Sequence, residues 1–211
     1  MKSGVNLMTA RKMRQITNKI IEVDPKFAGV IEKSELCDLG RTKVNDTYFK
    51  TLVQSIISQQ LATKAAEKIN DRVLALVKSE LEPEVILSLK PELLRSAGIS
   101  NAKVRAITEL SIASLDNRVN FSNFKQMPNH LITEELTKIW GIGRWTSEMF
   151  LIFHMGRLNV WPVGDLGVRR GWEKIHKLRS DIDPNKLDKK GIKFEGFQSV
   201  VAWYCWRAVD S

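Results

Sequence analysis

An all-α fold is predicted for this 211-residue chain, because its apolar residues recur at helical spacing almost throughout and its prolines and glycines fall where helices would begin and end. Strand-like alternation of apolar and polar residues is scarce. With 43% hydrophobic residues, the chain can bury a sizeable core in one compact domain or in two closely associated lobes. No low-complexity tract, long repeat or obvious linker interrupts it.

The individual helices follow from this pattern. Downstream of residue 50, apolar residues repeat at intervals of three and four, and a break near Ser58–Leu61 predicts two successive helices. Pro83 and Pro91 predict helix starts, since proline suits the first helical turn. The helix that begins at Pro91 should stop at Gly98, and another should begin after Ser100. Further helices are expected at about 131–139, 144–154 and 166–178.

The charge balance favours a polyanionic partner. The chain has 33 Lys and Arg against 24 Asp and Glu, hence a net charge of +9 and a pI near 9.6, which suits nucleic acid or an anionic membrane surface. No apolar run approaches the length that crosses a bilayer, and the basic N-terminus lacks the apolar stretch of a signal peptide. We therefore expect no membrane partner and a cytoplasmic, nucleoid-associated or nuclear location, not secretion.

Cysteine and histidine usage argues against a disulfide framework or a metal centre. The two cysteines, Cys37 and Cys205, lie far apart with no second pair. The three histidines, at positions 130, 154 and 176, share no metal-ligand spacing. We expect no metal held by side chains and no required cofactor.

The most informative stretch is Leu136–Trp172, which contains a Trp-Gly-Ile-Gly turn at residues 140–143 between two expected helices. Two glycines around one aliphatic residue permit a hairpin too tight for residues with a β-carbon. The second helix would present its first amide hydrogens where a phosphate oxygen can accept them. Taken alone, Gly-Ile-Gly also fits an ordinary turn between packed helices, and Trp145 alone also fits a core position.

Asp165 follows a Trp-Pro-Val-Gly loop and precedes a helix with apolar residues Val168 and Trp172. An aspartate in this place is typical of a helix N-cap. The helix dipole and the free amides stabilise negative charge there, and a reaction that builds positive charge on a sugar needs an ionised carboxylate. The residues alone leave both roles open, and the two roles are compatible.

Residues 136–171 resemble the hairpin and the Gly/Pro-rich loop with catalytic aspartate of the helix–hairpin–helix DNA glycosylase superfamily. Within it, Gly-Ile-Gly-Arg-Trp-Thr followed by Gly-Asp-Leu-Gly is similar to the 3-methyladenine DNA glycosylase II branch. Phe49–Ile69 resembles that branch's helix–turn–helix, whose turn enters the DNA. Ser96–Arg105 resembles its Gly-x-Ser-x-x-Lys turn, and Phe194–Arg207 its C-terminal aromatic block. These matches cover most of residues 45–207 in the expected order.

The resemblance implies two helical lobes of the helix–hairpin–helix DNA glycosylase type, with the active-site cleft between them. Lobe A would hold about residues 50–160, including both DNA-entering turns, and lobe B about 1–49 plus 161–211. Asp165 would lie where the lobes meet, facing the hairpin. The 211 residues would form a single glycosylase unit, acting as a monomer on double-stranded DNA that contains damaged bases.

The implied activity is that of a monofunctional glycosylase in base excision repair. Asp165 would be the catalytic carboxylate, hydrolysing the N-glycosidic bond of alkylated bases of the 3-methyladenine and 7-methylguanine type and leaving an abasic site. Trp145 and Phe197 would wall the pocket for the flipped-out, cationic base. Met149, one turn after Trp145, is a further pocket candidate, although packing between helices is the alternative.

The DNA grip is also implied by the resemblance. Gln60, with Gln59 beside it, would fill the gap left by the flipped base; a solvated turn is the alternative. Phosphate binding falls to Gly141, Gly143, Arg144, Trp145 and Thr146. In the family, hairpin carbonyls, here near Gly141 and Gly143, also hold a Na⁺ or K⁺ ion. Further basic candidates are Lys64, Lys103, Arg105 and Arg169.

Departures from the family pattern refine the prediction. Members that also cut the DNA backbone carry a Schiff-base lysine where this chain has Trp145, so lyase activity is not expected. Gly196 and Gln198 stand where the branch usually has proline and arginine. Trp203 and Trp206, three apart on the expected last helix, are interpreted as core residues. The alternatives are a non-catalytic helix–hairpin–helix DNA-binding protein and a sister monofunctional glycosylase for another lesion.

Overall fold

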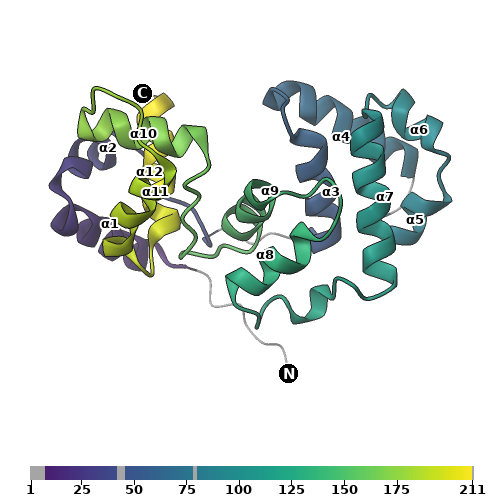
Figure 1. The fold of residues 1–211 in the computed structure, drawn as a ribbon, viewed down its shortest axis with the longest axis horizontal. Helices are drawn as coiled ribbons and strands as arrows, with labels where there is room; N and C mark the ends of the chain where they lie inside the picture. Colours follow the sequence, from purple (N-terminus) through teal and green to yellow (C-terminus); the bar gives the residue numbers. More distant parts are fainter. Residues whose placement is uncertain (1–7, 42–45, 78–79, 211) are drawn as a thin grey trace. The chain divides into compact units, whose positions relative to one another are not determined.

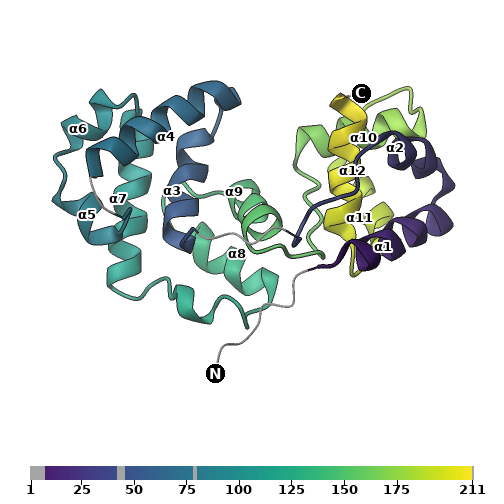
Figure 2. The same cartoon turned by 180° about the vertical axis from the view of Figure 1, so that it is seen from behind.

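A computed structural model describes residues 8–41, 46–77 and 80–210, and these residues form twelve α-helices (Figures 1 and 2). No strand occurs among them, which confirms the predicted all-α class. The chain divides into two compact units. Unit 1 comprises Met1–Val44 and Leu151–Ser211, and unit 2 comprises Asn45–Phe150. Unit 2 corresponds to the predicted lobe A and unit 1 to lobe B, but both boundaries differ: residues 151–160 belong to unit 1 and residues 45–49 to unit 2.

The helices of unit 1 come from both ends of the sequence. They are α1 (Ala10–Val23), η1 (Pro25–Phe27), α2 (Ala28–Lys33), α10 (Leu166–His176), α11 (Pro184–Gly191), η4 (Ile192–Phe194) and α12 (Gln198–Asp210). Those of unit 2 are α3 (Tyr48–Ser58), α4 (Thr63–Val77), α5 (Pro83–Ser88), α6 (Pro91–Ser96), α7 (Asn101–Leu115), η2 (Phe121–Asn123), α8 (Asn129–Thr137) and α9 (Arg144–Met149). A π-helix, η3 (Phe150–His154), continues directly from α9.

Helix ends agree closely with the sequence pattern. The break between α3 and α4 lies at the predicted place, and α5 and α6 begin at the predicted prolines. Gly98 has a φ of +103°, which only glycine adopts readily, and so ends the α6 segment. Ser100 caps α7 by accepting a hydrogen bond from the backbone N–H of Lys103. The predicted helix at 144–154 changes from α to π geometry at Phe150, and the helix predicted to reach 178 ends at His176, with Lys177 in the left-handed region.

Unit 1 is organised by the packing of α10 against α12, which lie side by side in Figures 1 and 2. Gly171 of α10 lies directly on the backbone of Cys205 in α12, so closely that an added β-carbon would overlap the Cys205 carbonyl. Trp172 then fills the core beside Phe27 and Phe194, with ring centroids 5.8 and 6.2 Å away. The missing side chain at position 171 therefore fixes the spacing of the two helices.

A buried carboxylate links the N-terminal helices of unit 1 to its C-terminal part. Asp24, 7% exposed, accepts hydrogen bonds from His176 Nε2 and Lys193 Nζ, each at 2.9 Å. Burial alone would raise the pKa of Asp24, but these two partners outweigh it and hold that pKa below its usual value of 3.8. The ring of His176 also stacks on Trp172 at 4.0 Å.

Unit 2 is built around the apolar faces of α3 and α7, which pack against each other. The buried residues of α3 repeat at intervals of three and four, as the sequence predicts for an amphipathic helix. An aromatic cluster at its base joins Tyr48, Phe121, Phe124 and Phe150. None of the helices in the described ranges is long and apolar enough to cross a membrane.

Gly171→Ala tests the helix contact in unit 1. The new methyl group meets the backbone of Cys205, which cannot move aside as a flexible side chain could, so we expect the free energy of unfolding to fall by about 3 kcal/mol. Gly29→Ala is the matched control, because nothing lies within 4 Å of its added β-carbon. It should leave stability unchanged or raise it by up to about 1 kcal/mol. Equal urea midpoints for both variants would contradict the packing argument.

Asp24→Asn tests the buried carboxylate through its pH dependence. A carboxyl group whose pKa is lowered by folding stabilises the protein above its ordinary pKa, and this contribution is lost as the pH falls through the lowered value. We expect the variant to lose about 2 kcal/mol at pH 7, and the difference from the wild type to shrink as the pH falls below 3.8. Urea unfolding at several pH values measures this difference; a gap independent of pH would show that Asp24 is not ionised in its pair.

Candidate active site

Asp165 is the N-cap of α10 and follows the Trp-Pro-Val-Gly turn. Backbone hydrogen bonds from Val163 to Trp161 and from Asp165 to Pro162 tighten this loop. Asp165 Oδ1 accepts a hydrogen bond of 2.8 Å from the backbone N–H of Val168, which confirms the predicted N-cap. The residue is 9% exposed. Its carboxylate is thus held at the positive end of a helix.

The same oxygen of Asp165 has a second donor that the sequence did not reveal. Trp206 Nε1, on α12, donates to Asp165 Oδ1 at 2.8 Å. The interpretation of Trp206 as a core residue is therefore wrong: the indole is half-buried and its polar edge contacts the candidate catalytic group. Helical spacing placed Trp206 on α12 but contains no information about which residue of α10 it meets.

The loop that leads to Asp165 is anchored on the start of α12. The Ser199 hydroxyl, fully buried, donates to the Arg157 carbonyl at 2.7 Å and accepts from the Val160 amide at 3.0 Å. The Gly196 amide donates to Asn159 Oδ1 at 2.7 Å. These bonds fix the residues that precede the Trp-Pro-Val-Gly turn.

The structure accounts for both departures from the family pattern in this region. Gly196 has a φ of +91° and uses its N–H as a donor, and proline can do neither. Gln198 Nε2 donates to the Gly191 carbonyl at 3.1 Å, so this side chain is engaged within unit 1. The loop at Gly196 therefore has a backbone conformation that proline could not adopt, and the hydrogen bond to Asn159 stabilises it.

Phe197, a predicted pocket wall, is largely enclosed in unit 1. It is 7% exposed, its ring lies 6.1 Å from that of Phe194, and Lys19 Nζ sits 5.5 Å from its ring centre. Cys205, which follows on α12, is fully buried, and both burial and the nearby Asp165 charge raise the pKa of its thiol. It is an uncharged neighbour of the carboxylate.

The predicted hairpin in unit 2 is formed as a tight turn between α8 and α9. Gly141 has a φ of +87°, and an added β-carbon would lie 2.5 Å from the methyl carbon of Ala106 in α7. Ile142 is 3% exposed and anchors the turn in the core. Gly143 is the N-cap of α9 and has no side chain to occupy the first amides of that helix.

The predicted site residues on α9 differ in how exposed their side chains are. Trp145 is 45% exposed, and Met149, one helical turn later, is half-buried, so an aromatic ring and a thioether share one face. Thr146 is 3% exposed, which places its hydroxyl inside the unit. Arg144 pairs with Glu148 at 2.8 Å while remaining largely exposed.

The two glutamines of the α3–α4 turn have different environments. Gln59 Nε2 donates to the Gly141 carbonyl at 3.1 Å and to Thr146 Oγ1 at 3.0 Å, so its side chain tethers the hairpin. Gln60 is exposed and has a φ of +56°, an uncommon conformation for a residue with a side chain. The two glutamines predicted to fill the gap left by the flipped base therefore have different roles within unit 2. Gln59 holds the hairpin, and Gln60 projects from the turn.

Two predicted phosphate contacts are also engaged within unit 2. Lys103 Nζ donates to the carbonyls of Ile57 and Gln59, each at 2.7 Å, and burial lowers its pKa. This ammonium thereby binds the C-terminal end of α3. The Arg105 guanidinium lies 4.1 Å from the ring centre of Trp140, at the start of the hairpin. Both cations stabilise the turns that the resemblance assigns to DNA.

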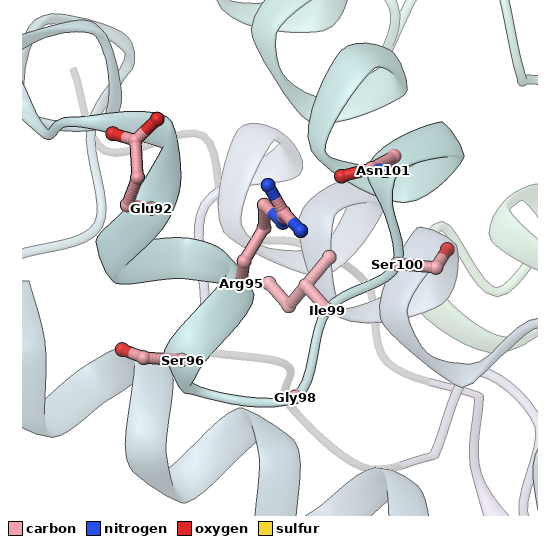
Figure 3. Close-up of a pocket in the computed structure, with 7 residues that line it drawn as sticks. All are labelled: Glu92, Arg95, Ser96, Gly98, Ile99, Ser100 and Asn101. Carbon is pink, nitrogen blue, oxygen red and sulfur yellow. The ribbon is translucent and has the colours of Figure 1, made fainter.

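A second turn of the same construction joins α6 to α7. Gly98, at positive φ, is followed by Ile99, which is 4% exposed, and by Ser100, the cap of α7. The hairpin repeats this order with its own glycine, buried isoleucine and cap. An open hollow lies at the α6–α7 turn, lined by Glu92, Arg95, Ser96, Gly98, Ile99, Ser100 and Asn101 (Figure 3). Its lining includes none of the predicted site residues.

The predicted site residues therefore fall into two groups. Unit 1 contains Asp165 and Phe197, and unit 2 contains Trp145, Met149 and both glutamines. Their assembly around one nucleotide stays a prediction. Within the described ranges, no cluster of three or more His, Cys, Asp or Glu residues could hold a metal ion.

Comparison with known proteins gives a consistent result. A family model described as HhH-GPD superfamily base excision DNA repair protein matches residues 53–194. DNA-3-methyladenine glycosylase 1 of Schizosaccharomyces pombe is 31% identical over 162 residues, which cover 75% of this chain and 71% of the relative.

Two solved structures are similar over nearly the whole chain. The DNA-3-methyladenine glycosidase of Bacillus halodurans is 32% identical, with a TM-score of 0.82, covering 93% of this chain and 89% of that one. A 3-methyladenine DNA glycosylase of Schizosaccharomyces pombe, in complex with abasic DNA, is 26% identical, with a TM-score of 0.81, covering 92% and 95%.

Gln59→Ala and Gln60→Ala test the division between the two glutamines. Removing the Gln59 amide leaves Gly141 and Thr146 without this donor, so we expect the free energy of unfolding to fall by about 1–2 kcal/mol. Gln60→Ala should change it by less than about 0.5 kcal/mol, because the side chain is exposed. Urea unfolding followed by tryptophan fluorescence measures both. A Gln59→Ala protein as stable as Gln60→Ala would show that the tether contributes nothing.

Proposed function

This chain belongs to the HhH-GPD superfamily of base excision DNA repair proteins, and we propose that it is a monofunctional DNA glycosylase that releases alkylated purines from double-stranded DNA. The family predicted from the sequence motifs is confirmed. Several relatives that cover most of the chain are named as 3-methyladenine glycosylases or glycosidases, which supports 3-methyladenine as a substrate. 7-Methylguanine is a cationic purine of the same chemical type. The product is an abasic site.

The observation that carries this proposal is the environment of Asp165. One carboxylate oxygen accepts hydrogen bonds from a backbone amide and an indole N–H, and the residue caps a helix whose dipole favours negative charge. A non-catalytic DNA-binding hairpin requires none of this. Charge held in this way suits a reaction that develops positive charge on the sugar.

The chemistry is hydrolysis through an oxocarbenium-like sugar. Methylation at N3 or N7 makes the purine cationic, so the glycosidic electron pair leaves with the base and the departing purine is neutral. Asp165 stabilises the sugar cation and orients the attacking water, whose oxygen bonds to C1′ and whose proton the carboxylate accepts. The base must first leave the helical stack, at a cost of a few kcal/mol.

Trp145 is the candidate for binding the flipped base. Its ring is 45% exposed on α9, and an electron-rich aromatic face attracts a cationic purine by about 0.5–2 kcal/mol. Met149 shares this face. Because position 145 holds no lysine, no Schiff base with the sugar can form there, which supports hydrolysis without strand cleavage.

The remaining assignments concern the DNA. The amides at Gly141, Gly143 and Trp145 bind phosphate oxygens, and the exposed Gln60 fills the vacated space in the stack. The hairpin carbonyls near Gly141 and Gly143 are the place for a Na⁺ or K⁺ ion, which would share them with the Gln59 amide and the Ser147 N–H. The enzyme acts as a monomer and needs no other cofactor.

Asp165→Asn is the decisive variant. Asparagine caps helices as well as aspartate does, so the protein should fold and bind DNA, whereas release of 7-methylguanine from methylated duplex DNA should fall by at least about 1,000-fold. Asp183→Asn is the control, because Asp183 also caps a helix of unit 1, α11. Chromatography of the released bases measures the rate. Near-normal release by Asp165→Asn would refute the catalytic assignment.

A further inference from the structure

Trp206 contacts Asp165 in a way that helix capping does not require. The Val168 amide already satisfies the cap, and the indole brings a second donor to the same oxygen, both at 2.8 Å. The two donors come from different helices, α10 and α12, and Trp206 is 41 residues from Asp165 in the sequence. A second hydrogen bond of this kind constrains the carboxylate beyond what the cap alone does.

The indole of Trp206 occupies space that is left by the missing side chain of Gly167. A β-carbon at Gly167 would lie 2.8 Å from Trp206 Cδ1, 3.0 Å from Nε1 and 3.1 Å from Asp165 Oδ1, so the hydrogen bond depends on a glycine at this position. On α10 the same face carries Gly171 four residues later, against the backbone of Cys205. Phe153 packs on Trp206 with ring centroids 5.3 Å apart. The indole is therefore held by its neighbours as well as by its hydrogen bond.

The chemistry of the Trp206 indole N–H limits what this residue can do at Asp165. An indole N–H donates but neither accepts nor readily gives up a proton, so Trp206 takes no part in proton transfer. What it can do is restrict rotation of the carboxylate. The terminal torsion of aspartate is broad and roughly two-fold, and a single amide donor can be satisfied by either oxygen. Two donors that converge on Oδ1 from separate helices select one orientation.

We propose that Trp206 is a positioning residue that holds Asp165 in its reactive orientation, with Phe153 holding Trp206 in turn. The proposal rests on the proposed function, because the orientation matters only if Asp165 takes part in the reaction.

Trp206→Phe removes the donor and keeps a ring in the same place. We expect single-turnover excision of 7-methylguanine to fall about 10- to 100-fold, because a small misplacement of a reactive group costs up to about 100-fold in rate, with binding to abasic-site DNA unchanged. Trp203→Phe is the matched control on α12, because Trp203 contacts Tyr204 and Arg207. It should leave the excision rate unchanged.

The dependence of the single-turnover rate on enzyme concentration separates positioning from a loss of binding. If Trp206 orients Asp165, the maximal excision rate should fall in Trp206→Phe, while the enzyme concentration that gives half of that rate stays at its wild-type value. Both quantities should stay unchanged in Trp203→Phe. Phe153→Leu, at a residue 51% exposed, provides a second variant that keeps the indole; it should slow excision about threefold or more.

The outcomes distinguish this proposal from the proposed function. If Asp165→Asn keeps its excision activity, the catalytic assignment fails regardless of Trp206. If Asp165→Asn loses activity while Trp206→Phe has the same maximal excision rate as Trp203→Phe, only the positioning role is overturned. If Trp206→Phe does not fold, a Phe153→Leu protein with the wild-type rate overturns it.

Discussion

The contact between Gly171 and the backbone of Cys205 is the constraint on which the candidate active site depends. It brings α10 and α12 so close that no β-carbon fits between them at this point, and Trp206, the next residue of α12, then reaches the cap of α10. Gly167 lies one turn earlier on α10, and its missing side chain likewise leaves space, here for the indole of Trp206. Two small residues four apart thus set the helix spacing and the hydrogen bonding of Asp165 together.

In unit 2, contacts from neighbouring elements hold the exposed hairpin between α8 and α9 in place. The hairpin has little core of its own, and it is braced from outside by Gln59 on a carbonyl and a hydroxyl, by Ala106 beneath Gly141, and by Arg105 on Trp140. A turn that binds phosphate through backbone amides gains from such bracing, because the entropy of ordering it is lost on folding and not on binding. The braces come from α7 and from the α3–α4 turn, so the two turns assigned to DNA stabilise each other within one unit.

Much of this architecture could be predicted from the sequence, because helix boundaries depend on local chemistry. Pro83, Pro91 and Gly98 mark the ends that they were expected to mark, and Asp165 is the cap that its position indicated. The roles of Gln59 and Trp206 could not be predicted in this way. Each depends on a contact with a residue distant in the sequence, at separations of 82 and 41 residues, and neither periodicity nor a motif specifies such a partner. A polar side chain in a turn and an indole on a helix have the same sequence pattern whether they face solvent, DNA or another helix.

The donors at Asp165 also indicate which substrates this site suits. A backbone amide and an indole stabilise a negative charge, but neither can readily transfer a proton to a departing base, and the neighbouring thiol of Cys205 is held neutral by burial. These three groups favour a sugar cation, and none of them protonates the leaving group. Neutral lesions leave as anions unless an acid protonates them, whereas a purine methylated at N3 or N7 already carries its positive charge and departs neutral. The electrostatics around Asp165 therefore match cationic alkylpurines better than neutral lesions, on grounds independent of the names of the relatives.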